Sequence, residues 1–309
     1  MCARGNSAPG AGRLRRAVRG FGSLLVVCAI FVAAYPFVSD VYGRFAAERN
    51  FSQAVSQAGS YDTAQVSEQL HEAQLFNSDL AGEPDVVERL TTQADANGYE
   101  AQMTLDDEII CWLDIPRLGL KVPVYRGSAD GGVVEQRLME GAVHMRETSL
   151  PVGGESTHAV ITAHSGMRNA SMFDNLGVLE PGDLFTLWVY GQPLVYEMSA
   201  SEVVEPEEVP GHIGIQSGDD LVTLVTCTPY GVNSHRLLVH ANRVQAAPPA
   251  STVPKMSDAL RSPHVMLFMV AVALSALALC SIALAKIRRN RAQRRTRCFS
   301  PAPDMERGR

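Results

Sequence analysis

The chain has 309 residues, a formal net charge of −6 and a mean hydropathy close to zero. The length allows one or two domains. The sequence has no internal repeat, no glycine-rich phosphate loop and no cluster of metal-ligand residues. Repeat proteins and the common nucleotide-binding and metal-dependent classes are therefore excluded. Charge is distributed unevenly: residues 1–19 carry five arginines and no acid, residues 286–309 carry nine Lys or Arg and two acids, and residues 20–285 therefore carry −18.

Each basic end adjoins an uncharged apolar run. The first, FGSLLVVCAIFVAAYPFV, covers 18 residues at 21–38, and the second, VMLFMVAVALSALALCSIALA, covers 21 residues at 265–285. At about 1.5 Å per residue the second run spans roughly 30 Å, the thickness of a bilayer core. Because Lys and Arg remain on the cytoplasmic side, we expect two membrane spans, with both termini cytoplasmic and residues 40–264 extracellular. A cleaved signal peptide is an alternative for the first run.

Between these two apolar runs the amino-acid pattern changes once, from helical to strand-like. Up to residue 105, stretches such as AQVSEQLHEAQLFNSDL have helical spacing and few β-branched residues. From residue 106, short runs rich in β-branched and aromatic residues alternate with turn residues, a pattern typical of a β-sandwich or barrel. Two stretches, GGVVEQRLMEG and NASMFDNLG, predict short helices inserted between strands. The predicted segments are a basic N-terminus (1–20), a membrane helix (21–38), a helical region (39–105), a β domain (106–246), a linker (247–264), a second membrane helix (265–285) and a basic tail (286–309).

Two of the six cysteines, Cys111 and Cys227, fall in the expected outer domain. Two cysteines in a domain of this size do not make a disulfide scaffold. A single Cys111–Cys227 disulfide is possible, but the setting of Cys227 favours a reactive thiol.

That setting is the stretch TLVTCTPYGVNSHRLLV at 223–239, which predicts a strand, a turn and a second strand. Cys227 ends the first strand and Arg236 begins the second, so we expect the two residues to be neighbours at one rim of a sheet. A cysteine nucleophile needs a nearby base or cation, because an ordinary thiol with a pKa of about 8.5 is mostly protonated at neutral pH. Arg236 supplies the cation. His164 ends the apolar run HAVITAH at a similar rim position and is the candidate acid and base, whereas His158 would lie about 20 Å away.

The motif TLVTC followed by TPYGVNSHR resembles the sortases, the membrane-anchored cysteine transpeptidases of Gram-positive bacteria, and its longer form resembles their pilus-building class C. The stretches DIPRLGLKVPVYRG, SLPVGGESTHAVITAHSG and MFDNL support the resemblance, which covers about residues 100–245. It implies an eight-stranded β-barrel and no cofactor or metal. It also implies Cys227 as the nucleophile, His164 as the general acid and base, and Arg236 as the stabiliser of the oxyanion or substrate.

The implied reaction cuts an LPXTG-like sorting signal after its threonine and joins the threonine to a lysine amine of another pilin. The implied partners are pilins and surface proteins with such signals, and not nucleic acid. A housekeeping sortase that anchors proteins to cell-wall peptide, an L,D-transpeptidase, for which the expected motif is missing, and an inactive adhesion module are the alternatives. Class C sortases usually carry a lid motif of Asp-Pro-aromatic; here the nearest match, Glu83-Pro84-Asp85, lacks the aromatic residue.

Overall fold

The computed structural model describes residues 45–82, 98–106, 108–165 and 172–250, together with the single residues 30, 35 and 43. Both predicted membrane spans, apart from residues 30 and 35, and the proposed lid residues Glu83, Pro84 and Asp85 lie outside this part of the chain. Of the helices that the described residues form, none is both long enough and apolar enough to cross a bilayer.

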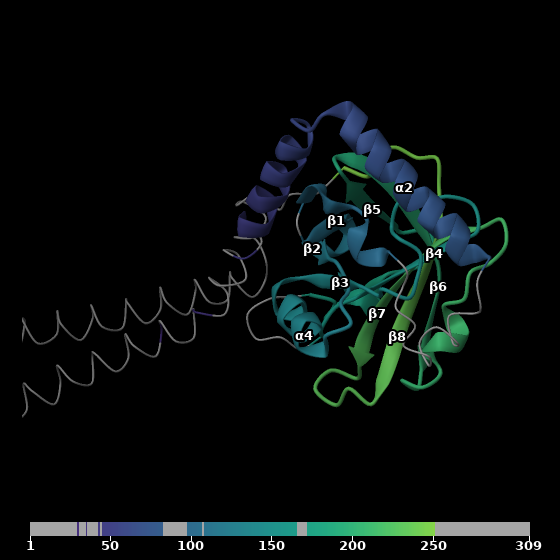
Figure 1. The fold of residues 1–309 in the computed structure, drawn as a ribbon. Helices are drawn as coiled ribbons and strands as arrows, with labels where there is room; N and C mark the ends of the chain where they lie inside the picture. The colour runs from purple at the N-terminus through teal and green to yellow at the C-terminus, as the bar shows by residue number, and fades with distance from the viewer. Residues whose placement is uncertain are drawn as a thin grey trace, which may run out of the picture. The chain divides into compact units, whose positions relative to one another are not determined.

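Within the described residues, eight strands close into a barrel in the order β1-β2-β3-β4-β7-β8-β6-β5 (Figure 1). The predicted eight-stranded barrel is therefore confirmed. The strands are β1 (Ile109–Ile115), β2 (Leu120–Tyr125), β3 (Ala142–His144), β4 (Thr157–Thr162), β5 (Leu184–Val189), β6 (Gln192–Val204), β7 (Asp220–Thr228) and β8 (His235–Arg243).

The barrel core follows from the alternation of side chains along each strand. Leu113 of β1, Ile161 of β4, Leu224 of β7 and Val239 of β8 are completely buried inside it. Strands β4 and β7 pair in parallel, whereas β8 pairs antiparallel with β7 on one side and with β6 on the other. Because parallel β4 and β7 end at the same rim, residues that follow β4 lie beside the end of β7.

Helix α2 (Thr63–Ala81) follows a helical stretch at residues 45–58 and packs against the barrel (Figure 1). It begins where the Asp62 side chain accepts a hydrogen bond from the Ala64 backbone amide, and it ends at Gly82. Its buried residues, Val66, Ala73, Asn77 and Leu80, lie on one face at helical spacing. This face closes part of the hydrophobic core, which Val66 and Ala73 join.

Between strands, α4 (Gly131–Glu140) forms where GGVVEQRLMEG predicts a helix. In NASMFDNLG, the described residues form only the short 3-10 helix η4 (Leu176–Val178), so no α-helix is seen there. Four further 3-10 turns are described, at η1 (Tyr99–Ala101), η2 (Thr104–Asp106), η3 (Pro116–Leu118) and η5 (Val209–His212).

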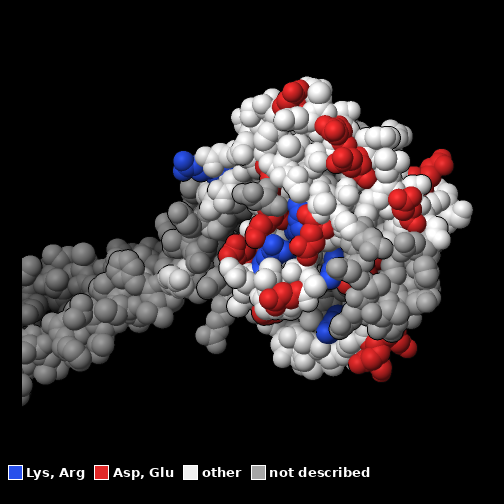
Figure 2. Space-filling view, in the orientation of Figure 1, with Lys and Arg blue, Asp and Glu red and all other residues white. Residues whose placement is uncertain are grey.

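Acidic and basic side chains are unevenly distributed on the face that Figure 2 shows. Basic side chains gather over β2, β3 and α4, with acidic side chains beside them, whereas acidic side chains mark α2. One of the pairs that account for this mixture joins Arg137 Nη2 of α4 to Glu108 Oε1 at 3.0 Å. Arg137 Nη1 also donates to the Arg126 carbonyl at 2.8 Å, so this side chain ties α4 to the residues that flank β1 and β2.

Candidate active site

The β7–β8 hairpin predicted from the sequence is present, and it places Cys227 directly opposite Arg236 in the antiparallel register. The turn between them uses two residues with left-handed backbone, Gly231 at φ 75° and Asn233 at φ 60°. These are residue types that adopt positive φ at low cost. The turn-forming residues in the sequence thus place the Cys227 thiol and the Arg236 guanidinium on adjacent strands.

His164 lies beside this hairpin because the chain that leaves β4 stays attached to the end of β7. The Ala163 amide donates to the Val225 carbonyl at 3.2 Å, and Thr226 Oγ1 donates to the Ala163 carbonyl at 2.8 Å. One residue on, Ser165 Oγ donates to the Cys227 carbonyl at 2.7 Å. His164 is therefore held between two residues that are both bonded to β7, next to Cys227.

The imidazole of His164 faces an acidic side chain from α4. His164 Nε2 lies 3.4 Å from Glu135 Oε1, with side-chain exposures of 28% and 63%. Glu135 sits two residues before Arg137, the residue that ties α4 to Glu108 and to the Arg126 carbonyl. Glu135 therefore lies where its carboxylate can orient the His164 ring.

The Arg236 guanidinium is turned toward its own hairpin. Its Nη1 donates to the carbonyls of Asn233 at 3.2 Å and His235 at 3.0 Å. Within the described residues both bonds use Nη1, so the donors on Nε and Nη2 are available to a bound carbonyl. Cys227, His164 and Arg236 are all partly exposed, as residues that meet a substrate must be.

The second cysteine of the β domain has no part in this arrangement. Cys111 and Cys227 are both free thiols, so the disulfide that the sequence allowed is not formed. Cys111 is buried in β1, and burial raises the pKa of its thiol far above the ordinary value. Cys111 therefore stays protonated and unreactive, and Cys227 is the free thiol of this domain that a substrate can reach.

Metal binding finds no support in the same residues. Throughout the described ranges, no group of three or more His, Cys, Asp or Glu side chains is arranged to hold a metal ion.

Sequence reasoning missed two residues of this site. Ser165 has no role in the sequence-based prediction, but its hydroxyl donates to the Cys227 carbonyl at 2.7 Å. Glu135 was not singled out at all, because no local pattern distinguishes it from other exposed acids on α4. Its contact with His164 depends on how the helix packs, which periodicity alone does not reveal.

Comparison with known proteins agrees with this geometry. The Sortase domain family model matches residues 113–244. A crystal structure of sortase C-1 from Actinomyces oris is 39% identical, and the match covers 59% of this chain and 99% of that chain with a TM-score of 0.50. The chain belongs to the sortase family. Sortase C1 of GBS pilus island 1 is 35% identical, with 67% and 94% of the two chains covered and a TM-score of 0.55.

More distant sortases are also similar. Sortase A of Bacillus anthracis is 22% identical over 222 residues, which cover 72% of this chain and 94% of that protein. Sortases are cysteine transpeptidases, so this sortase is an enzyme whose chemistry requires a reactive thiol. The free, partly exposed Cys227 meets that requirement within the described residues, and the buried Cys111 does not.

Proposed function

We propose that this sortase is a class C enzyme that polymerises pilins. It cuts an LPXTG-like sorting signal after the threonine and joins the threonine carboxyl to a lysine amine of the next pilin. The observation that carries the proposal is the hairpin that sets Cys227 opposite Arg236 with His164 bonded alongside. The similarity to sortase C-1 of Actinomyces oris and to sortase C1 of GBS pilus island 1 supports assignment to class C.

In the first half of the reaction, Cys227 Sγ attacks the threonine carbonyl carbon and forms a carbon–sulfur bond. The peptide carbon–nitrogen bond breaks as His164 donates a proton to the leaving amine. The negative charge that develops on the carbonyl oxygen is stabilised by the Nε and Nη2 donors of Arg236. Glu135, whose Oε1 lies 3.4 Å from His164 Nε2, can hold the ring in position for this transfer.

In the second half, the lysine amine attacks the thioester carbon. His164, now neutral, accepts the proton that the amine loses, and the Cys227 thiolate leaves as the new amide forms. Splitting one difficult amide exchange into two acyl transfers is the general advantage of a covalent intermediate. The same three residues serve both halves with no metal or cofactor invoked.

The location that we propose follows from the charge pattern. Spans at 21–38 and 265–285 would anchor the enzyme in the cell membrane, with both basic ends cytoplasmic and the catalytic barrel outside. A membrane-impermeant thiol reagent on wall-permeabilised cells should then label Cys227 and spare Cys2 and Cys298. Labelling of Cys298 from outside would overturn this topology.

The test of function uses the purified full-length enzyme with a pilin that carries an LPXTG-like signal. Two acceptors are offered together, a second pilin with a free lysine and a cell-wall peptide amine. Mass spectrometry of the product should find threonine joined to the pilin lysine. Products on the wall peptide alone would instead identify a housekeeping sortase that anchors surface proteins.

Replacement of the proposed nucleophile gives the matching prediction. Cys227→Ala should abolish both the thioacyl intermediate and the product, because no other group in the site can form the carbon–sulfur bond. The fold should survive, since the change removes only one partly exposed sulfur atom. Product formation at the wild-type rate would mean that Cys227 is not the nucleophile.

A further inference from the structure

The outer faces of β4, β7 and β8 carry a second set of polar residues beside the candidate active site. Alternate residues of each strand point outward. On β7, Thr223 is four residues from Cys227 on this same face, about 13 Å away at 3.3 Å per residue. Three rows cross the strands: His158, Thr223 and His240; then Val160, Val225 and Leu238; then Cys227 and Arg236.

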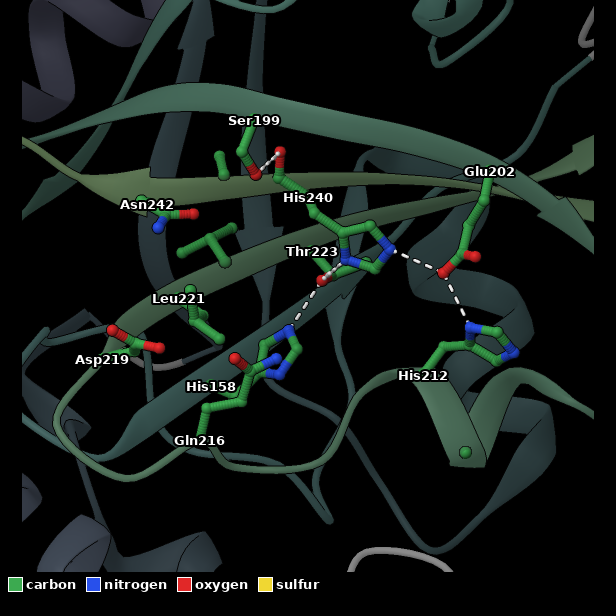
Figure 3. A pocket seen from close by; sticks show the side chains of 13 residues that line it. His158, Ser199, Glu202, His212, Gln216, Asp219, Leu221, Thr223, His240 and Asn242 are labelled. Carbon is green, nitrogen blue, oxygen red and sulfur yellow. Dashed lines mark hydrogen bonds and ion pairs between the residues drawn. The ribbon is translucent and has the colours of Figure 1, made fainter.

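The first row forms a hydrogen-bonded relay (Figure 3). His158 Nδ1 lies 2.8 Å from the Gly214 carbonyl oxygen, and His158 Nε2 lies 2.6 Å from Thr223 Oγ1. Thr223 Oγ1 lies 2.8 Å from His240 Nδ1, and His240 Nε2 lies 2.9 Å from Glu202 Oε1. The relay thus has four links and runs from a carbonyl at one end to a carboxylate at the other.

The hydrogens available to neutral groups do not suffice for these links. Each link needs one hydrogen, and both ends, the Gly214 carbonyl and the Glu202 carboxylate, can only accept. Neutral His158 and His240 have one N–H each, and Thr223 has one O–H. Neutral rings would therefore supply three hydrogens for the four links that the distances show, so the relay is complete only when it holds one additional proton.

The surroundings place this proton at the His240 end. Burial lowers the pKa of His158, against a smaller opposing effect of its bond to Gly214, so that ring stays neutral. For Glu202, burial opposes ionisation, but hydrogen bonds and charge from His240 and His212 outweigh it and lower the pKa. With His158 neutral and Glu202 accepting, the fourth link needs a hydrogen on His240 Nε2 as well as the one on Nδ1, so the count of hydrogen bonds assigns the additional proton to the His240 ring.

A second buried histidine shows that this requirement is not general. His144 Nδ1 lies 2.8 Å from Tyr99 Oη, and His144 Nε2 lies 2.8 Å from the Ser149 carbonyl. Tyr99 Oη accepts from the Gly127 amide at 2.9 Å. Here Gly127, Tyr99 and a neutral His144 supply one hydrogen to each of these three links. The longer contact of His144 Nε2 with Thr148 Oγ1, at 3.3 Å, shares the ring N–H, because the Thr148 hydroxyl donates to the Met145 carbonyl. His144 therefore needs no extra proton.

Both ends of the unbalanced relay hold the connection between β6 and β7, residues 205–219. Gly214 belongs to this connection, and so does His212, whose Nδ1 lies 2.7 Å from Glu202 Oε1. Two apolar residues of the connection, Val209 and Ile213, pack in a cluster with the second row of the face, which contains Val225. The connection thus covers the row that separates the relay from Cys227.

We propose that the relay from His158 to Glu202 is a proton-dependent clamp that fastens the β6–β7 connection to the catalytic face of the barrel. With its extra proton, all four links and the His212–Glu202 contact are made together. Without it, three hydrogens serve four links: either the lone pair of His240 Nε2 faces the Glu202 carboxylate, or the lone pair of His158 Nδ1 faces the Gly214 carbonyl of the connection, and that link is lost. The clamp therefore holds at lower pH and loosens as the pH rises through the loss of the proton.

The relay can exchange its proton with solvent. A pocket of about 450 Å³ opens beside it, lined by His158, Thr223, His240, Glu202 and His212 among other polar residues (Figure 3). The remaining charged side chain of the lining is Asp219, from the end of the connection, and no Lys or Arg contributes to the lining. The ionisable groups that face the relay are thus three histidines and two acids, which favours retention of a proton.

The direct test is nitrogen NMR of the histidine rings in the purified full-length chain, from about pH 6 to about pH 9. The His240 ring should show both nitrogens protonated at the lower end and lose one proton as the pH rises, while His158 and His144 stay neutral. Thr223→Val, which removes the central hydroxyl, should abolish the His240 imidazolium signature at neutral pH, and Thr223→Ser should restore it. A neutral His240 ring in the wild-type chain throughout this range would overturn the proposal.

Hydrogen exchange of the connection tests the clamp itself. Amide protection factors in residues 209–216 should fall about fivefold between the low and high ends of the range, the effect of roughly one hydrogen bond. The fall should be absent in Thr223→Val and present in Thr186→Val, a matched change at a buried hydroxyl with no partner among the described residues. A pH-independent wild-type protection would overturn the clamp, and neither readout depends on which substrate the sortase uses.

Discussion

At the scale of single residues, the contact between Glu135 and His164 can be tested by a single substitution. The Glu135 carboxylate faces His164 Nε2 at 3.4 Å and is mostly exposed, so its effect should be moderate. Glu135→Gln should lower kcat by up to about fivefold, the effect expected of an exposed ion pair. The reason is that the His164 ring loses the carboxylate that orients it. Steady-state kinetics with a sorting peptide would measure this effect.

The control for this change is Glu140→Gln on the same helix, because Glu140 contacts Tyr125 Oη and not His164. This variant should keep the wild-type kcat. If Glu135→Gln also keeps it, the carboxylate does not act on His164 during turnover.

Arg236 gives a second residue-scale prediction. Arg236→Lys keeps the charge but loses the planar, forked set of donors, of which Nη1 is already used by the Asn233 and His235 carbonyls. A lysine can make those bonds or reach the substrate, but it cannot do both in this geometry. We expect kcat/KM to fall by about a hundredfold or more, the loss typical of a missing oxyanion donor. Near-wild-type turnover would show that positive charge alone suffices.

At the scale of elements, one buried amide of α2 is hydrogen-bonded to the chain between β3 and β4. Asn77 Nδ2 donates to the Leu150 carbonyl at 3.0 Å, and Asn77 Oδ1 accepts from the Leu150 amide at 2.7 Å. Asn77→Ala would leave the buried Leu150 amide without this acceptor, whereas the Leu150 carbonyl would still accept from the Val152 amide at 2.8 Å. The free energy of unfolding should fall by about 1–3 kcal/mol. Urea denaturation of the full-length chain measures this loss. Gln74→Ala, at an exposed position of the same helix, should change it by less than about 0.5 kcal/mol.

At the scale of the whole molecule, acid stability should depend on the buried His144. Burial lowers the pKa of His144 to about 4, opposed by its bond to the Ser149 carbonyl. In the unfolded chain a histidine titrates near about 6.5. Between these two pH values the unfolded state binds a proton at this histidine and the folded state does not. The free energy of unfolding therefore falls as the pH drops from about 6.5 toward 4, by about 1.4 kcal/mol per pH unit.

The variant that isolates this effect is His144→Gln, whose amide can accept from Tyr99 and donate to Ser149 without titrating. Its unfolding free energy should decline less steeply than that of the wild type between these pH values, as measured by urea denaturation at each pH. His71→Gln, at an exposed position on α2, should leave the wild-type slope unchanged. An unchanged slope in His144→Gln would contradict a buried neutral ring at position 144.

Much of the fold could be predicted because its signals are local. Alternating β-branched residues predict the long strands, and Pro229, Gly231 and Asn233 predict the turn that joins β7 to β8. Strand β3, with three residues from Ala142 to His144, was missed because so short a run has no periodicity to detect. The roles of Cys227, His164 and Arg236 came from resemblance to the sortases and remain predictions.

The sequence by itself determined that Cys227 and Arg236 would be neighbours, since a short antiparallel turn leaves two strands no other arrangement. Only the tertiary structure decided what surrounds them. The parallel pairing of β4 with β7 joins residues more than sixty positions apart, and it brings His164 to Cys227 and His158 to Thr223. Such pairings, and the packing of Glu135 against His164, depend on barrel closure and on contacts across the whole chain. No local spacing encodes them, because each strand alone would pair equally well with several others.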